Sequence, residues 1–280
     1  MNDGTADPAA HRLVFVAGLH RSGTSPTARL LSAHPQVSGL TDTGQKEDEG
    51  QHVQHVYPSA RAYGGAGRFA FAPAAHLTEQ SPLVAPGNAE RLFQQWAPYW
   101  DLSRPVLVEK SPPNLVMTRF LQALFPEARF LVVMRHPVVV ALSTSKWAGF
   151  TPLRRLVEHW VRAHEIFLAD APHLRRLHVL TYERLVADPG AALADVGDFL
   201  GLDGPIPRES VDAQRSTAYV RQWEQLRASR NPLHRRSLAR MQAELGERVE
   251  RFGYRLDDLD DVRGFPPVPA GPPARPAPEP

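Results

Sequence analysis

The sequence predicts an α/β fold, a three-layer α/β/α sandwich around a central parallel sheet. Two observations carry this prediction. Short runs of consecutive apolar and β-branched residues recur along the chain, as expected for strands that are covered on both faces. Longer segments with helical apolar spacing lie between these runs. The alternation indicates repeated strand–helix–strand units.

The first predicted strand spans residues 13–17 and leads into a loop with two glycines. Further strands are predicted at residues 106–108, 130–134 and 178–181. Apolar spacing predicts helices at residues 114–125, 156–169, 189–200 and 233–251. Pro26 and Pro137 follow strands and mark helix starts, because proline is favoured at the first helical position. Residues 39–87 show no sustained period, and long irregular segments in compact domains usually carry function.

Composition favours one globular domain. Hydrophobic residues make up 42% of the 280 residues, enough for a full core, and no change in composition marks an internal linker. We expect a flexible N-terminus at residues 1–12, one domain at 13–262 and a disordered proline-rich tail at 263–280. No apolar run approaches the roughly 18 residues of a membrane span, and the polar start lacks the apolar core of a secretory signal. A cytoplasmic location is therefore expected.

Charge and cysteine content exclude several function classes. With 32 Lys and Arg against 30 Asp and Glu, the net charge of +2 does not fit a nonspecific nucleic-acid binder. The absence of cysteine excludes disulfides, thiolate nucleophiles and cysteine-ligated metal sites. His52 and His55 are close in sequence, but no third ligand follows at a recognisable spacing, so no metal site is predicted.

The loop after the first strand has the features of a phosphate-binding turn. Gly18 and Gly23 are spaced as in the pattern G-x-x-x-x-G-K-[ST], except that Thr24 stands where the pattern has lysine. Backbone amides at the start of the following helix are suited to binding a phosphate. The hydroxyl and basic side chains available there are those of Arg21, Ser22, Thr24 and Ser25. The fold is therefore expected to be P-loop-like.

This loop resembles the 5′-phosphosulfate-binding motif of the sulfotransferase superfamily, whose members use 3′-phosphoadenosine 5′-phosphosulfate (PAPS). The run Arg21-Ser-Gly-Thr-Ser25 is similar to the motif variant of tyrosylprotein and bacterial members. The resemblance extends over residues 13–202 at the level of motifs. It implies five consecutive cofactor-binding residues, Arg21, Ser22, Gly23, Thr24 and Ser25.

A second motif follows the strand predicted at residues 130–134. Arg135 stands at the carboxyl end of that strand, where open α/β sheets bind ligands, and Ser143 lies on the order of 10 Å along the next helix. The two side chains could share one phosphate in a charge-assisted clamp. The spacing resembles the family's 3′-phosphate motif, an arginine followed eight positions later by a serine. The family's next cofactor arginine is replaced here by Trp147, with Lys146 beside it.

Other segments resemble the family in ways that imply further roles. Lys110 follows a predicted strand, where the tyrosylprotein enzymes have a lysine implicated in stabilising charge on the transferring group. The run Tyr-Glu-Arg-Leu at residues 182–185 resembles a segment whose tyrosine lies beside the cofactor, which implies that role for Tyr182. The family also has a basic or hydroxyl-rich segment that closes over the nucleotide. Candidates for it, without a unique alignment, are residues 215–221 and 227–240.

The general base is expected in the acidic segment after the first helix, because a carboxylate or imidazole must remove the proton of the accepting hydroxyl. An ungapped alignment with tyrosylprotein sulfotransferases places Asp42 at the base, whereas the spacing of heparan N-sulfotransferases places Glu49 there. We favour Glu49. The neighbouring alternatives are Glu47, Asp48 and His52. The catalytic residues that the resemblance implies are thus Glu49, Lys110 and Arg21.

The resemblance implies a PAPS-dependent sulfotransferase that moves a sulfuryl group in line to a hydroxyl of a small-molecule acceptor, such as a natural product or a lipid. Aromatic residues, including Tyr57, Phe69, Trp96 and Trp100, are expected to favour an apolar acceptor. The oligomeric state stays open, with a homodimer as one option.

The alternative is a P-loop small-molecule kinase that uses ATP and Mg²⁺. Such a kinase needs the lysine that is missing at Thr24 and an aspartate at a strand end to hold Mg²⁺. Neither the strand at residues 106–108 nor the one at 130–134 ends in aspartate. A third interpretation, a nucleotide-binding module without catalysis, is disfavoured by Lys110 and the acidic segment.

Overall fold

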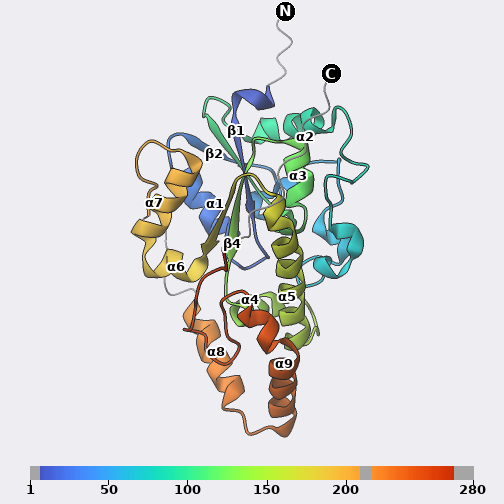
Figure 1. The fold of residues 1–280 in the computed structure, drawn as a ribbon, viewed down its shortest axis with the longest axis vertical. Helices are drawn as coiled ribbons and strands as arrows, with labels where there is room; N and C mark the ends of the chain where they lie inside the picture. Colours follow the sequence, from blue (N-terminus) through green and yellow to red (C-terminus); the bar gives the residue numbers. More distant parts are fainter. Residues whose placement is uncertain (1–6, 209–215, 268–280) are drawn as a thin grey trace, which may run out of the picture.

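The computed structural model describes residues 7–208 and 216–267 and has the α/β/α architecture that the sequence predicts (Figure 1). A five-stranded sheet in the order β2-β3-β1-β4-β5 forms the central layer, and all neighbouring strands are parallel. The strands are β1 (Arg12–Ala17), β2 (Val37–Gly39), β3 (Val106–Lys110), β4 (Arg129–Met134) and β5 (Leu177–Thr181).

Helices cover both faces of this sheet (Figure 1). Those of the first half are α1 (Thr24–Ser32), α2 (Asn88–Trp96), α3 (Thr118–Leu124) and α4 (Pro137–Ser145). Those of the second half are α5 (Leu153–Asp170), α6 (Tyr182–Ala187), α7 (Pro189–Leu200), α8 (Thr217–Arg227) and α9 (Pro232–Glu250). Figure 1 shows α8 and α9 extending beyond the sheet at the edge where the strands end.

Alternating residues of the strands divide the core between the two faces, because successive side chains of a strand point to opposite sides. In β1, Leu13 and Phe15 pack with residues of α2 and α3, whereas Val14 and Val16 pack with residues of α1, α6 and α7. A further cluster joins α4, α5 and α9 on the side of α2 and α3. Both faces of the sheet are therefore buried, which explains the uninterrupted apolar runs in the sequence.

All four predicted strands are present, and the sheet has one more. β2 was missed because it is three residues long and carries a single large apolar residue, Val37. The helix predicted at residues 114–125 is divided into a 3-10 turn at Pro112–Val116 and the helix α3. The helix expected to start at Pro26 begins two residues earlier, at Thr24.

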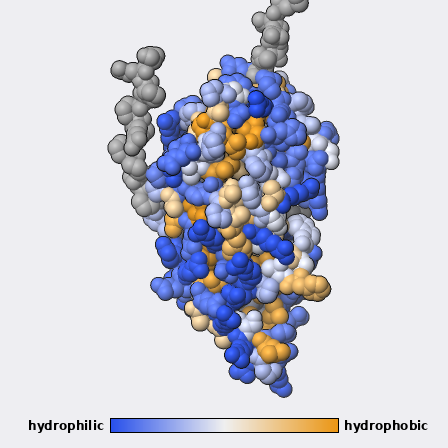
Figure 2. Space-filling model, turned by 90° about the vertical axis from the view of Figure 1, so that its right-hand side faces the viewer, coloured by the Kyte–Doolittle hydropathy of each residue, from blue (hydrophilic) through white to orange (hydrophobic). Residues whose placement is uncertain are grey.

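The irregular segment predicted at residues 39–87 is built from short 3-10 turns between β2 and α2. The face shown in Figure 2 is mostly hydrophilic, with apolar patches separated from one another. Along the described residues, no helix has both the length and the apolar character to cross a membrane.

The predicted terminal segments are described only in part. Asp7 accepts a hydrogen bond from the amide of Ala9 and caps a short turn before β1. Phe265, in the segment predicted to be a disordered tail, packs against Phe167 with their ring centroids 5.6 Å apart. The contacts of the domain thus continue beyond the predicted boundary at residue 262. Residues 1–6 and 268–280 lie outside the described residues.

Candidate active site

The carboxyl ends of four parallel strands meet at one edge of the sheet, which is where open α/β sheets bind ligands. The loop 18–23 follows β1, Lys110 ends β3, Arg135 follows β4 and Tyr182 follows β5. Because these strands are neighbours in the sheet, their side chains converge although they lie far apart in the sequence.

Two glycines of the loop between β1 and α1 are required by its geometry. Gly18 has a φ of 145°, and a Cβ atom there would lie 2.3 Å from the carbonyl oxygen of Val133. Gly23 has a φ of 107°, and its Cβ atom would lie 2.5 Å from the ring of Tyr182. Glycine is therefore required at both positions, because the backbone has a positive φ and neighbouring protein atoms occupy the place of a side chain.

Arg21 adopts a left-handed backbone conformation with a φ of 72°. Its Nε donates a hydrogen bond of 2.7 Å to Oγ of Ser143 on α4. Its guanidinium also lies 4.7 Å from the centre of the Trp147 ring, within cation–π distance. The predicted loop arginine and the predicted helix serine are thus in direct contact.

The surroundings of Arg135 are those of an anion-binding residue. Its Nη1 donates to the carbonyl of Arg21 at 3.2 Å, its Nη2 donates to Oγ of Ser216 at 2.7 Å, and it stacks on Tyr182 at 4.2 Å. Its Nε is buried without a hydrogen-bond partner, and burial lowers the pKa of the guanidinium. The buried Nε–H of this guanidinium has no acceptor in the protein. A phosphate oxygen would accept its hydrogen bond and balance its positive charge.

The start of α8 closes over this cluster. Ser143 donates to the hydroxyl of Tyr219 at 3.1 Å, and Lys146 Nζ donates to the same hydroxyl at 3.3 Å. Burial acts to raise the pKa of Tyr219, but the hydrogen bonds from Ser143, Lys146 and Arg21 outweigh it, so that this pKa is lowered. The hydrogen-bond donors around the Tyr219 hydroxyl therefore favour a negatively charged oxygen at this place.

A cavity of about 420 Å³ opens at this edge of the sheet. Its lining includes predicted cofactor residues from three strand ends, namely Arg21, Gly23, Thr24, Ser25, Arg135 and Tyr182. Trp147 and Tyr219 lie at the same cavity, as do two carboxylates, those of Glu47 and Glu49. The structure thus brings the predicted nucleotide residues and the acidic segment to one pocket.

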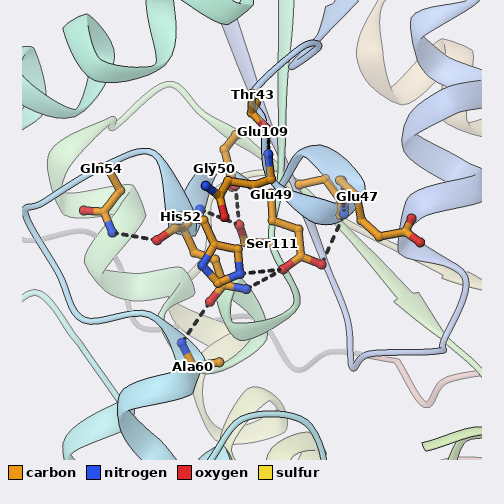
Figure 3. Close-up of polar contacts among 12 residues, drawn as sticks. Thr43, Glu47, Glu49, Gly50, His52, Gln54, Ala60, Glu109 and Ser111 are labelled. Carbon is orange, nitrogen blue, oxygen red and sulfur yellow. Dashed lines mark hydrogen bonds and ion pairs between the residues drawn. The ribbon is translucent and has the colours of Figure 1, made fainter. Parts of the chain in front are cut away.

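Glu49 is the buried carboxylate of the acidic segment, with 7% of its surface exposed. Lys110 Nζ donates to its Oε1 at 3.3 Å, and Gln51 Nε2 donates to its Oε2 at 2.5 Å (Figure 3). The Lys110 ammonium also donates to the carbonyl of Glu47 at 2.7 Å. Two of the three predicted catalytic residues, Glu49 and Lys110, therefore form a direct ion pair.

The other candidates for the base have different surroundings. Asp48 accepts hydrogen bonds from the amide and hydroxyl of Thr43 and serves to close its loop. Asp42 is exposed, and Glu47 pairs with Arg29 at 3.6 Å. His52 Nε2 lies 3.6 Å from Glu49, and burial lowers the pKa of His52 despite that carboxylate.

His20 is a cavity residue that the sequence did not single out. Burial is the main cause that lowers its pKa to about 4, so the imidazole is neutral near pH 7. Its Nδ1 is buried without a hydrogen-bond partner, and Glu49 and Lys110 are among the charges that act on it. Within the described ranges, no group of three or more His, Asp or Glu side chains is placed to hold a metal ion.

Three predicted site residues, Ser22, Lys110 and Ser143, are not among the residues that line the cavity. Ser143 is 1% exposed, and its hydroxyl accepts from Arg21 and donates to Tyr219. The hydroxyl of Ser22 is fully buried and donates to the carbonyl of Leu19 at 2.7 Å, so it cannot serve a ligand in this conformation. Lys110 is 4% exposed and lies behind Glu49, to which it is paired, rather than in the cavity wall itself.

The comparison with protein families agrees with this geometry. The model described as "Sulfotransferase family" matches residues 14–205, well over half of the chain. The chain belongs to the sulfotransferase family. It is 25% identical to protein-tyrosine sulfotransferase 2 of Gallus gallus over 199 residues, which cover 68% of this chain and 51% of that protein.

Another curated relative of this sulfotransferase chain is the nodulation protein NoeE of Sinorhizobium fredii, with 27% identity over 218 residues, covering 68% of this chain and 50% of that protein. The chain spans about half the length of these two relatives. Among solved structures, sulfotransferase STF9 of Mycobacterium avium superposes with a TM-score of 0.52 at 15% identity, covering 87% of this chain and 77% of that one. This likeness shows the shared fold.

Of the two candidate closing segments in this sulfotransferase chain, residues 215–221 reach the site, whereas no residue of 227–240 lines the cavity. Ser216 and Tyr219 contact Arg135 and Ser143, yet the sequence singled out only the segment 215–221 and not these two side chains. In the sequence, the only indication of their role is that Ser216 and Tyr219 carry hydroxyl groups and follow the basic residue Arg215. Arg215 itself lies outside the described residues.

Four of the aromatic residues expected to favour an apolar acceptor do not line the cavity at Arg21. Tyr57, Phe69, Trp96 and Trp100 are buried with at most 6% of their surfaces exposed, and they pack in the hydrophobic core. Tyr57 also lies at a second cavity, together with Tyr63.

Proposed function

We propose that this chain is an enzyme that transfers the sulfuryl group of PAPS to a hydroxyl of a small-molecule acceptor. The observation that carries the proposal is that Arg21, Arg135 and Glu49 line one cavity. Ser143 contacts Arg21, and Lys110 pairs with Glu49, just beneath this lining. Positive groups gathered at three strand ends suit a nucleotide with two phosphate sites. A buried carboxylate at the same cavity suits the removal of a proton.

The donor would be held by both parts of the cluster. In this proposal, the backbone of the loop 18–25 and the start of α1 bind the 5′-phosphosulfate. Arg135 and Ser143 bind the 3′-phosphate, with Arg135 offering the Nε that lacks a partner. Ser216 and Tyr219 on the α8 side would contact the same phosphate. Tyr182 lies between the two sites, where it stacks on Arg135.

The proposed transfer needs one base and a field of positive charge. The acceptor hydroxyl gives its proton to Glu49 while its oxygen bonds to sulfur, and the bond between sulfur and the bridging phosphate oxygen breaks. The products are a sulfate ester and adenosine 3′,5′-bisphosphate. As Glu49 takes the proton it loses its charge, which leaves Lys110 with an unmatched positive charge just as negative charge builds up on the leaving oxygens.

Calorimetry with adenosine 3′,5′-bisphosphate and with ATP–Mg²⁺ tests the nucleotide. We expect binding of the bisphosphate without Mg²⁺, and Arg135→Ala should weaken it by about 10- to 100-fold, the worth of a hydrogen bond to a charged group. Arg91→Ala is the control, because Arg91 is exposed on α2, away from the cavity. Preference for ATP–Mg²⁺ would support the kinase alternative instead.

Turnover with PAPS tests the chemistry. Arg21→Ala, Lys110→Ala and Glu49→Gln should each lose most of the transfer activity, measured as a mass gain of the acceptor. Wild-type turnover in the Arg21 and Lys110 variants would contradict the proposed roles.

A further inference from the structure

Strand β3 ends in two adjacent charged residues that reach the acidic segment from opposite faces of the sheet, since consecutive strand residues alternate. Lys110 contacts Glu49 directly. Glu109 lies under the backbone of Gly50, where a Cβ atom would be 2.5 Å from Glu109 Oε1. The segment that carries Glu49 is therefore held on both sides by one strand end, and Gly50 is needed so that Glu109 can fit.

A chain of hydrogen bonds links Glu109 to Glu49 (Figure 3). Oγ of Ser111 donates to Glu109 Oε1 at 2.5 Å and accepts from the amide of Gln51 at 2.9 Å. The side chain of Gln51 then donates to Glu49 Oε2 at 2.5 Å. The side-chain oxygen of Gln51 accepts from the amide of Ala60 at 2.8 Å, so the glutamine cannot rotate freely.

All residues of this hydrogen-bond network are buried, so water does not compete for their hydrogen bonds. Glu109, Ser111 and Gln51 have exposed fractions of 1%, 0% and 2%. Burial raises the pKa of Glu109 to about 7, and the hydrogen bonds from Ser111 and Asn114 offset this only in part. Burying the carboxyl of Glu109 is not expected to raise the free energy of unfolding by itself. Its satisfied network instead fixes geometry.

We propose that Glu109 and Ser111 are positioning residues, which hold the Glu49 carboxylate at the cavity through Gln51. The inference rests on the proposed function, because it takes Glu49 as the base. Neither residue lines the cavity. They act on the rate of transfer by keeping Glu49 in the orientation that meets the acceptor hydroxyl.

The test is a double-mutant cycle between Ser111→Ala and Glu49→Gln. Ser111→Ala should lower kcat at least tenfold, while the KM for PAPS and the affinity for adenosine 3′,5′-bisphosphate change less than twofold. In the Glu49→Gln background, Ser111→Ala should have almost no further effect, because a residue that acts through Glu49 has nothing left to position.

Ser38→Ala is the matched control. Ser38 is also a buried serine, and its Oγ accepts the amide of Asp101 at 2.9 Å, on β2 and away from Glu49. This variant should lose comparable stability but keep its turnover. If Ser111→Ala does not fold, the nearly isosteric Glu109→Gln takes its place, with a smaller loss of kcat that again disappears in the Glu49→Gln background.

Three results would overturn the inference: wild-type kcat in Ser111→Ala or its replacement, full additivity with Glu49→Gln, or an equal loss in Ser38→Ala. In each of these, wild-type transfer remains and the proposed function stands. If the wild-type protein shows neither transfer from PAPS nor bisphosphate binding, both proposals fail together.

Discussion

Gly23 shows how one residue without a side chain allows two others to meet. The ring of Tyr182 lies where a Cβ atom of Gly23 would be, and Arg135 stacks on that ring at 4.2 Å. A larger residue at position 23 would displace the ring and remove the support of the guanidinium. The loop glycine thus contributes to the position of an arginine on a different strand.

Gly23→Ala should therefore lower the free energy of unfolding by more than the strain of the left-handed backbone alone. Gly44 is the matched control, since it also has a positive φ of 69°, but a Cβ atom there would have no other atom within 4 Å. Gly44→Ala should destabilise the fold by about 1 kcal/mol from the left-handed backbone, and Gly23→Ala by about 1 to 3 kcal/mol more from overpacking. Urea unfolding measures both.

Binding should separate the two glycine variants further. Only Gly23→Ala should weaken the affinity for adenosine 3′,5′-bisphosphate, because only this change moves Tyr182 and Arg135. Equal unfolding free energies and equal affinities in the two variants would show that the contact with Tyr182 has no consequence.

At the level of elements, α8 is the part of the site with the least support of its own. Trp223 is its one buried residue among those described, whereas α9 buries Met241, Leu245 and Val249. The beginning of α8 is tied to the site by the contacts of Ser216 with Arg135 and of Tyr219 with Ser143. Few buried contacts imply that α8 opens more readily than α9.

Hydrogen exchange should show this difference. Adding adenosine 3′,5′-bisphosphate should slow exchange of the α8 amides about tenfold, which corresponds to about 1.4 kcal/mol, because a bound phosphate adds partners for Arg135 and Tyr219. The α9 amides serve as the internal control and should change little. Equal protection of α8 with and without the ligand would argue against closure of α8 over the nucleotide.

The same comparison explains which elements the sequence could predict. The apolar runs in β1, β3 and β4 are buried on both faces, and a run of that kind has few other interpretations. β5 is an edge strand of which only Leu180 and Thr181 are buried, but it also carries consecutive apolar residues. β2 is too short to stand out. Residues 114–125 have helical spacing, but the chain turns at Met117, where the φ of −138° is not helical. Such a local break depends on packing that no periodicity records.

The candidate site divides in the same way. Arg21, Arg135 and Ser143 belong to local patterns, so the sequence identified them. The pairing of Glu49 with Lys110, 61 positions apart, depends on how β3 and the irregular segment pack. Glu109 and Gln51 have no motif of their own, because their role comes from hydrogen bonds formed only in the folded chain.

Over the whole molecule, buried histidines should make stability depend on pH. Burial lowers the pKa of His136, His159 and His164 to about 4, 3 and 4. In the unfolded chain these groups take up protons below about pH 6.5, while in the folded chain they stay neutral. Stability is therefore lost as the pH falls below 6.5. Glu109 and Glu183, whose pKa values are raised by burial, act in the opposite direction.

We expect the urea midpoint to fall between pH 7 and pH 5, with each of the three histidines contributing up to about 2 kcal/mol. His164→Gln should reduce this pH-dependent loss by about 1 to 2 kcal/mol, because its imidazole is completely buried beside Trp160. His234→Gln, at an exposed position on α9, is the control and should leave the slope unchanged. A slope that is the same in both variants would contradict this origin of the acid sensitivity.

The surroundings of Trp147 have an optical consequence. The protein has five tryptophans, of which four are buried and Trp147 is 50% exposed at the mouth of the cavity. Its ring has Arg21 at 4.7 Å and Lys46 at 4.8 Å. Because an exposed indole emits at longer wavelengths than a buried one, the red edge of the fluorescence spectrum comes mainly from Trp147. The chain thus carries its own fluorophore beside the arginine that a nucleotide would approach.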